Sequence, residues 1–114
     1  MRLKTSIFVS AVLRKETADG AFAALLKKGA EDAGAIFLVH QKNRYSADIF
    51  GPAPQIFLTE EATADRWVER LGEGLESEAV EKLLESQRRF DPDCWIVEIE
   101  KPGLLTSINI VKTE

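Results

Sequence analysis

The sequence has few of the residues that mark specialised protein classes. Its 114 residues include one cysteine, Cys94, one histidine, His40, and four prolines. A single cysteine cannot form an intramolecular disulfide, which excludes a small oxidised secreted scaffold and favours a reducing cytoplasm. No apolar run approaches the roughly 20 residues that cross a bilayer, so we expect no membrane contact.

Positive charge is also too scarce to indicate a nucleic-acid partner. The net charge is −4, and residues 1–50 carry eight Lys or Arg against five Asp or Glu, whereas residues 51–114 carry seven against fourteen. Attraction between two halves of one domain explains this polarity better than a basic binding face does. The chain has no glycine-rich phosphate loop, so we expect neither nucleotide nor nucleic acid as a ligand.

What is present is ordinary globular composition, with 45% apolar and 30% charged residues. This composition predicts one domain over residues 1–114. At its start, Thr5, Ile7 and Val9 alternate with their neighbours and predict a long amphipathic strand over 5–13. The segment resembles a secretory signal peptide superficially but lacks a small-residue cleavage site. A helix capped by Asp19 and starting near Gly20 is expected next.

That helix is predicted from apolar residues at helical spacing, namely Phe22, Leu25, Leu26 and Ala30. Residues 35–39 are apolar on both faces, which predicts a central strand. Residues 45–50 alternate, and we expect them to form a hairpin with the central strand through a turn at 42–44. Gly51 to Pro54 form a corner, followed by a short apolar run at 56–58.

The second half of the chain contains one ambiguous segment and two clear ones. Residues 62–72 fit both helical and strand spacing, and we favour a strand over 66–71 before a turn at 72–74. Ser77 is predicted to cap a helix ending near Phe90, with Glu78–Lys82 and Glu85–Arg89 pairs. Its apolar face consists of Val80, Leu83, Leu84, Gln87 and Phe90.

A strand packed on one face is predicted next, because Trp95, Val97 and Ile99 alternate with polar neighbours, and Trp95 is the expected core anchor. Residues 104–114 are read as an extra strand or tail. The predicted fold is therefore α+β, with a mainly antiparallel sheet of about five strands covered by two α-helices.

Stretches from the beginning, middle and end of the chain carry a family resemblance. They are RLKTSIFVSAVLRK, KKGAEDAGAIFLV with YSADIFGPAPQ, and RRFDPDCWIVEIE. The most specific positions are Phe90, Asp91, Pro92, Asp93, Trp95, Glu98 and Glu100. Through these stretches the chain resembles an uncharacterised bacterial family, the domain of unknown function 1491. The resemblance implies a bacterial cytosolic protein and brings no activity, cofactor or catalytic residue.

Residues with catalytic chemistry are few. Hydrolysis by a triad needs a nucleophile, a base and an orienting group, yet the chain has no Gly-x-Ser-x-Gly turn and one histidine. We expect His40 to be structural and Cys94 to be a buried, inert thiol. Asp91 and Asp93 with Glu98 or Glu100 offer oxygen ligands, but turn formation and a solvated strand face explain them better, so no metal or cofactor is expected.

Two functional classes remain open. We favour a cytosolic protein-interaction or regulatory module without catalytic activity, binding a protein partner, with homo-oligomers as one form of such binding. The alternative is a small carboxylate-dependent, hydrolase-like enzyme using Asp48 or the Asp91 and Asp93 pair. A predicted interaction surface lies at the end of the second helix and the turn after it. It consists of Arg88, Arg89, Asp91 and Asp93.

Overall fold

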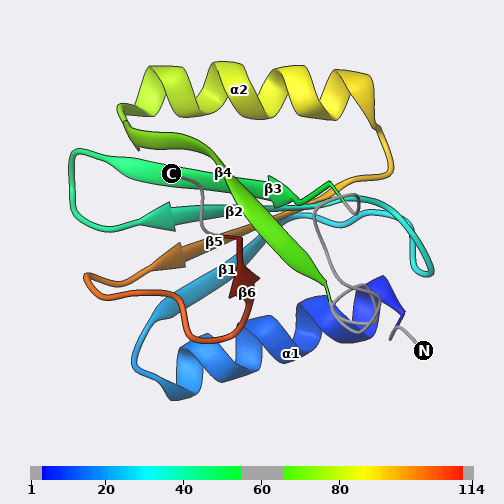
Figure 1. Ribbon diagram of the computed structural model, residues 1–114, viewed down its shortest axis with the longest axis horizontal. Helices are drawn as coiled ribbons and strands as arrows, with labels where there is room; N and C mark the ends of the chain where they lie inside the picture. The colour runs from blue at the N-terminus through cyan, green and yellow to red at the C-terminus, as the bar shows by residue number, and fades with distance from the viewer. Residues whose placement is uncertain (1–3, 55–65, 112–114) are drawn as a thin grey trace.

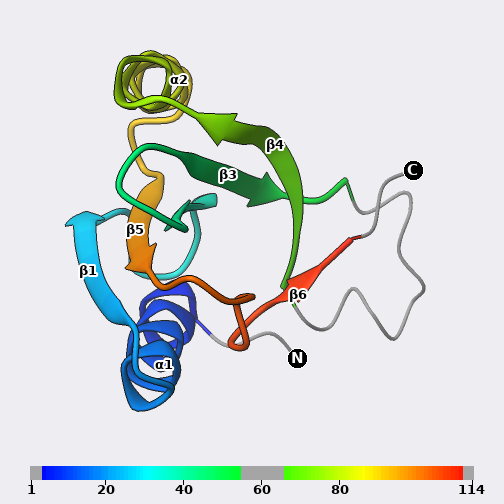
Figure 2. The same ribbon diagram turned by 90° about the vertical axis from the view of Figure 1, so that its left-hand side faces the viewer.

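The computed structural model describes residues 4–54 and 66–111, which form a six-stranded sheet with one helix on each face (Figures 1 and 2). In chain order the elements are α1 (Thr5–Ala18), β1 (Phe22–Lys27), β2 (Ile36–Gln41), β3 (Ala47–Pro52), β4 (Trp67–Leu75), α2 (Ser77–Phe90), β5 (Trp95–Glu100) and β6 (Asn109–Ile110). None of the helices in these ranges is long and apolar enough to span a membrane.

The sheet is mixed, with the strand order β1-β5-β2-β3-β4-β6. Strands β2, β3 and β4 are antiparallel neighbours, β5 lies parallel to β2, β1 pairs antiparallel with β5, and β6 lies parallel to β4. The expectation of a mainly antiparallel sheet of about five strands is corrected in both respects. The parallel pair arises because α2, 14 residues long, is the crossover that returns the chain to the middle of the sheet.

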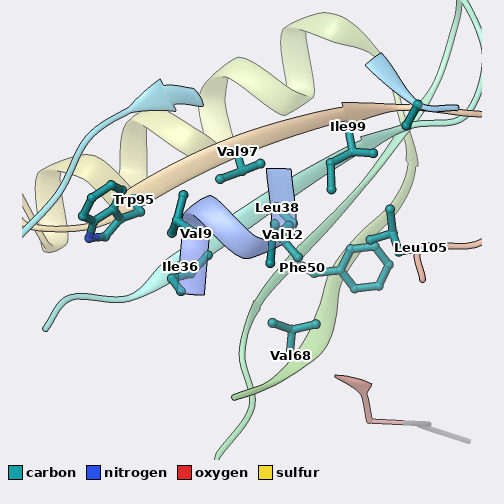
Figure 3. Packing of buried hydrophobic residues seen from close by; sticks show 11 residues of the cluster. Val9, Val12, Ile36, Leu38, Phe50, Val68, Trp95, Val97, Ile99 and Leu105 are labelled. Carbon is teal, nitrogen blue, oxygen red and sulfur yellow. The ribbon is translucent and has the colours of Figure 1, made fainter. Parts of the chain in front are cut away.

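The two central strands, β2 and β5, are covered on both faces. Helix α1 and the sheet face that it covers form one cluster (Figure 3), which includes Val9, Val12, Ile36, Leu38, Phe50, Trp95, Val97 and Ile99. Helix α2 and the opposite sheet face form another, which includes Phe37, Val39, Ile49, Val80, Leu84, Cys94 and Ile96. The predicted central strand and its hairpin with β3 are confirmed. Strand β5 is confirmed as a strand, but packing on one face is wrong, because Ile96 is as buried as Val97.

The first two elements are the reverse of those predicted from the sequence. Residues 5–18 form helix α1, in which Thr5, Val9, Val12 and Glu16 are buried. Their spacing of four, three and four residues is that of one helix face. The alternation that predicted a strand over 5–13 was coincidental, because the segment is apolar enough to fit either period.

The helix predicted from near Gly20 is instead the strand β1. Gly20 adopts a φ of +91°, a conformation that glycine takes without strain, and it makes the turn from α1. Phe22, Leu25 and Leu26 fit helical spacing but form no buried face, and the Phe22 side chain is 65% exposed. Pairing with β5, which is distant in sequence, decides the conformation here.

Strand β4 confirms the favoured reading of its ambiguous segment, because residues from Trp67 onward form a strand. The predicted turn at 72–74 is wrong, since β4 continues to Leu75 with irregular register against β3. The apolar run at 56–58 and residues 62–65 lie outside the described residues. The expected last strand is present as two residues, Asn109 and Ile110.

The second predicted helix is confirmed as α2, and so are its two ion pairs. Lys82 lies 3.5 Å from Glu78, and Arg89 lies 2.8 Å from Glu85. Two details differ from the prediction. Glu76, not Ser77, is the N-cap and makes no side-chain capping bond. The Phe90 side chain is 89% exposed, and the α2 residues in the cluster on the sheet are Val80, Leu83 and Leu84.

Trp95 is the core anchor that the sequence predicts. It is 3% exposed, and its indole Nε1 donates a hydrogen bond to the carbonyl of Ala30 at 2.8 Å. We expect Trp95→Ala to lower the free energy of unfolding by roughly 3–5 kcal/mol, measured by urea denaturation, because it leaves a large cavity against α1.

Phe90→Ala is the matched control for this substitution. Because its ring is exposed, the change in stability should stay within about 0.5 kcal/mol. Equal losses in the two variants would contradict the assignment of Trp95 to the core.

Candidate functional site

The predicted interaction surface lies at the end of α2 and in the turn before β5. Arg89 donates to Glu85, and the backbone N–H of Asp93 donates to Asp91 Oδ1 at 3.0 Å. Arg88 is half-buried and Asp93 is exposed. These side-chain hydrogen bonds are local, as expected for residues that stabilise a helix end and shape a turn.

This turn is fixed against the end of β1. The Lys27 ammonium donates to the carbonyls of Pro92 at 2.6 Å and Cys94 at 2.9 Å. Gly34, at a φ of +105°, packs so closely that a Cβ there would lie 2.4 Å from the carbonyl oxygen of Asp93. The turn is therefore one end of a larger surface that continues along β1.

Strand β1 is an edge strand with apolar side chains in solvent. In the described part of the sheet it pairs with β5 and with no other strand, and its outer side is open in Figure 2. Its exposed apolar side chains are Phe22, Leu25 and Leu26. Alternate N–H and C=O groups of an edge strand point away from its neighbour and can pair with another chain.

Natural edge strands are usually protected by charge, proline or shortness. Strand β1 has six residues and no proline, and its one charged side chain, Lys27, is turned toward the carbonyls of the 92–94 turn. A bulge between Leu25 and Lys27 interrupts the end of the strand, leaving Phe22–Leu25 in regular register. At the other edge of the sheet, β6 is two residues long.

A polar cleft of about 670 Å³ opens where the parallel strands β2 and β5 end. Ligand sites of sheets with parallel strands commonly lie at this end. The lining comes from the β2–β3 hairpin, the first turns of α2 and the end of β5. Its charged residues are Lys42, Arg44, Glu81, Glu98, Glu100 and Lys101.

Glu98 and Glu100 line this cleft without an ion pair in the described residues. In residues 4–54 and 66–111, no ion pair joins either carboxylate to a cation, because Lys42 lies 2.6 Å from Asp48 and Lys101 lies 2.8 Å from Glu16. Burial, with a smaller effect from Glu100, raises the pKa of Glu98 above its usual value. Sequence reasoning placed both glutamates on a solvated strand face, which holds for the exposed Glu100 but missed the half-burial of Glu98.

The carboxylates of the enzyme alternative are not brought together. Asp48 on β3 pairs with His40 on β2, and His40 pairs with Ile99 near the end of β5. Asp91 and Asp93 instead precede the start of β5, so they lie at the other end of that strand. Asp48 is buried and accepts a hydrogen bond from the N–H of Gly74 at 2.8 Å. Burial would raise its pKa, but Lys42 and the Gly74 bond outweigh burial and lower it. Asp48 therefore holds β4 in place.

The contacts of the other two candidates, His40 and Cys94, indicate structural roles. His40 is 2% exposed, its Nε2 lies 3.1 Å from the carbonyl oxygen of Lys101, and burial lowers its pKa. Burial raises the pKa of the Cys94 thiol, and Cys94 is buried as predicted. In the described ranges, no group of three or more His, Cys, Asp or Glu side chains is placed to hold a metal ion.

One buried carboxylate, Glu16, was missed by sequence reasoning. It accepts hydrogen bonds from the backbone N–H groups of Thr106 at 2.9 Å and Ser107 at 2.8 Å, and from Lys101 Nζ. Burial would raise its pKa, but these hydrogen bonds outweigh burial and lower it. Glu16 thereby attaches the segment before β6 to α1, which is a structural role.

Comparisons with known proteins place the whole chain in one group. The model of a family described as protein of unknown function (DUF1491) matches residues 3–108. No curated protein matches the chain. A solution structure of a protein from A. tumefaciens is 45% identical, with 100% of this chain and 98% of that chain covered and a TM-score of 0.85. A crystal structure of a DUF1491 family protein from Caulobacter crescentus is 27% identical, with 98% and 100% covered and a TM-score of 0.79.

The raised pKa of Glu98 leads to a prediction about the stability of the fold. A carboxyl whose pKa is higher in the folded state destabilises the fold above that pKa and has no such effect below its unfolded pKa, near 4.5. Glu98→Gln should therefore raise the midpoint of thermal unfolding at pH 7, and this gain should vanish as the pH falls to about 4.

Glu85→Gln is the control, because it removes the exposed pair with Arg89 and should lower stability at pH 7 by up to about 0.5 kcal/mol. A loss of stability in Glu98→Gln at pH 7 would show that the carboxylate is compensated in the fold.

Proposed function

The chain belongs to the DUF1491 family, whose function is unknown, and from its own structure we propose that it is a protein-interaction module that binds a partner through the open edge of β1. The observation that carries this proposal is the combination of an unpaired strand edge with exposed apolar side chains. The module acts without catalysis, and its single buried thiol suits a reducing cytoplasm.

Strand addition is the binding mode that this edge supports. A partner strand would gain main-chain hydrogen bonds along Phe22–Leu25 and would cover the apolar side chains of Phe22 and Leu26. Exposed apolar residues on an unprotected edge promote aggregation unless something covers them. Partner binding at this edge explains why residues 22–26 include no charged residue and no proline.

The turn after α2 supplies a polar rim to the same surface. Interfaces commonly have an apolar centre and a charged, solvent-accessible border. Lys27 bonds the carbonyls of Pro92 and Cys94, so the turn that contains Asp91 and Asp93 and follows Arg88 and Arg89 is attached to the end of the edge strand. We propose that the surface predicted from the sequence contributes orientation and specificity, while β1 contributes most of the buried apolar area.

A carboxylate-dependent, hydrolase-like enzyme is the less favoured alternative. Two of its candidate acids are engaged in the structure: Asp48 pairs with Lys42, and Asp91 accepts a hydrogen bond from the backbone N–H of Asp93. Neither arrangement provides a free acid and base facing one another, which general acid–base catalysis requires. The observed contacts therefore support binding over hydrolysis.

The proposal is tested by capture of partners from extract of the native cell. Phe22→Lys places a charge on the open edge and should abolish retention of the specific partner, identified by mass spectrometry. Ile7→Lys is the matched control, because Ile7 is 50% exposed on α1, and it should retain the partner. Circular dichroism verifies that both variants fold.

The double variant Arg88→Ala with Asp93→Ala separates the rim from the edge. We expect it to retain less partner than the unmodified protein, by roughly tenfold at most. Full retention would remove the turn from the surface but leave the edge proposal standing. Full retention by the folded Phe22→Lys variant would contradict the proposed function itself.

A further inference from the structure

We propose that the partner strand carries a Lys or Arg opposite Ala24, whose cationic group contacts Glu98 across β1, and an apolar residue opposite Phe22. This inference rests on the proposed function, because it specifies the chemistry of the strand that pairs with β1. It is drawn from the register of β1 on β5 and from the charge of the cleft beside them.

The register places Glu98 of β5 directly opposite Ala24 of the edge strand β1. Ala24 pairs with Glu98 and Phe22 with Glu100, and directly paired residues of antiparallel strands share one face. That face is the one covered further along by α2, because Ile96 on β5 packs in the cluster with Val80 and Leu84. Helix α2 lies over the middle of the sheet and leaves the face of β1 open (Figure 2).

The small side chain of Ala24 leaves a path between Glu98 and a partner strand. Neighbouring strands lie about 4.8 Å apart, so a partner strand would lie about 10 Å from β5. A long cationic side chain leaning inward and a glutamate leaning outward can meet over an alanine. At Phe22 the aromatic ring itself fills the corresponding space, so an apolar residue on the partner strand is complementary to it.

In the described ranges, no ion pair joins Glu98 to a cation of the chain itself, and Arg44 lines the same cleft without an ion pair. Lys42 and Lys101 line the same cleft but are bonded to Asp48 and Glu16 on the face of α1. Lys27, at the end of β1, is bonded to backbone carbonyls. A cation from outside would therefore meet a half-buried carboxylate without displacing an existing ion pair, which gives charge complementarity across the interface.

The same register argues against a second copy of this chain as the occupant. An antiparallel pair of two β1 strands centred on Ala24 would place alanine opposite alanine and bring no cation to Glu98. Each copy also carries a net charge of −4, which opposes self-association. The favoured occupant is thus a different protein with alternating apolar and basic residues on one face of a strand.

The test is selection from a phage-displayed library of random twelve-residue peptides on the immobilised protein. The library is first depleted on the Phe22→Lys variant, so that enriched peptides need the open edge. We expect enriched peptides to share a Lys or Arg with an apolar residue two positions away. The best peptide and its counterpart with Glu at the basic position are then synthesised for fluorescence anisotropy.

The unmodified protein should bind the basic peptide at least tenfold more tightly than the acidic one. Glu98→Lys should reverse this order, and Glu98→Gln should reduce the ratio even if the lysine variant folds poorly. Glu78→Lys is the matched control, because Glu78 is exposed on α2, and it should keep the original order.

The possible failures are distinguishable. Peptides that need Phe22 but show no basic position, or an unchanged preference in the folded Glu98→Lys and Glu98→Gln variants, would overturn this inference and leave the proposed function standing. A dimer through β1 in sedimentation would also overturn this inference alone, because the second copy would occupy the edge without bringing a cation to Glu98. No Phe22-dependent peptide would overturn both.

Discussion

Strand β5 fixes the positions of most other elements, because it pairs with β1 on one side and β2 on the other. It is covered by α1 on one face and by α2 on the other, and Trp95 anchors its start through the carbonyl of Ala30. Once β5 lies in the centre of the sheet, β1 becomes an edge strand. The register of this pair then sets which β5 side chains lie next to that edge.

Buried polar contacts explain why the two faces of the sheet differ in charge. On the face of α1, Glu16 and Asp48 are buried and engage Lys101 and Lys42. Breaking such buried pairs is strongly destabilising, so these cations are committed to the fold. The other face has Glu98 and Glu100 without a cationic partner in the described residues. The difference in charge is therefore a consequence of how the fold uses its lysines.

Sequence reasoning succeeded where one period dominates over a long enough segment. Strand β2 is apolar on both faces, and α2 combines a long apolar stripe with charged pairs at i and i+4, so both were predicted correctly. It failed at residues 5–27, where short apolar segments fit both periods. Within this range, pairing with the distant strand β5 determines the conformation of β1. The parallel register of β2 and β5 also depends on the path of α2 over the sheet, which local patterns do not contain.

Only part of the candidate site could be predicted, because some of its residues are adjacent in the sequence and others come together only in the fold. Arg88, Arg89, Asp91 and Asp93 stand in one short segment that the sequence displays directly. The exposure of Phe22 could not be predicted, because apolar residues at helical spacing are normally buried. The half-burial of Glu98 could not be predicted, because it depends on the positions of α2 and the β2–β3 hairpin, which line the same cleft but lie elsewhere in the sequence.

Amide hydrogen exchange of β1, followed by NMR with and without a bound strand, tests the central claim most directly. In the free protein, the amides of Phe22–Leu25 that point away from β5 should exchange rapidly. In the complex, the account predicts that these amides become protected, while the amides of the central strand β2 change little. Binding without added protection at β1 would contradict the claim that the partner pairs with this edge.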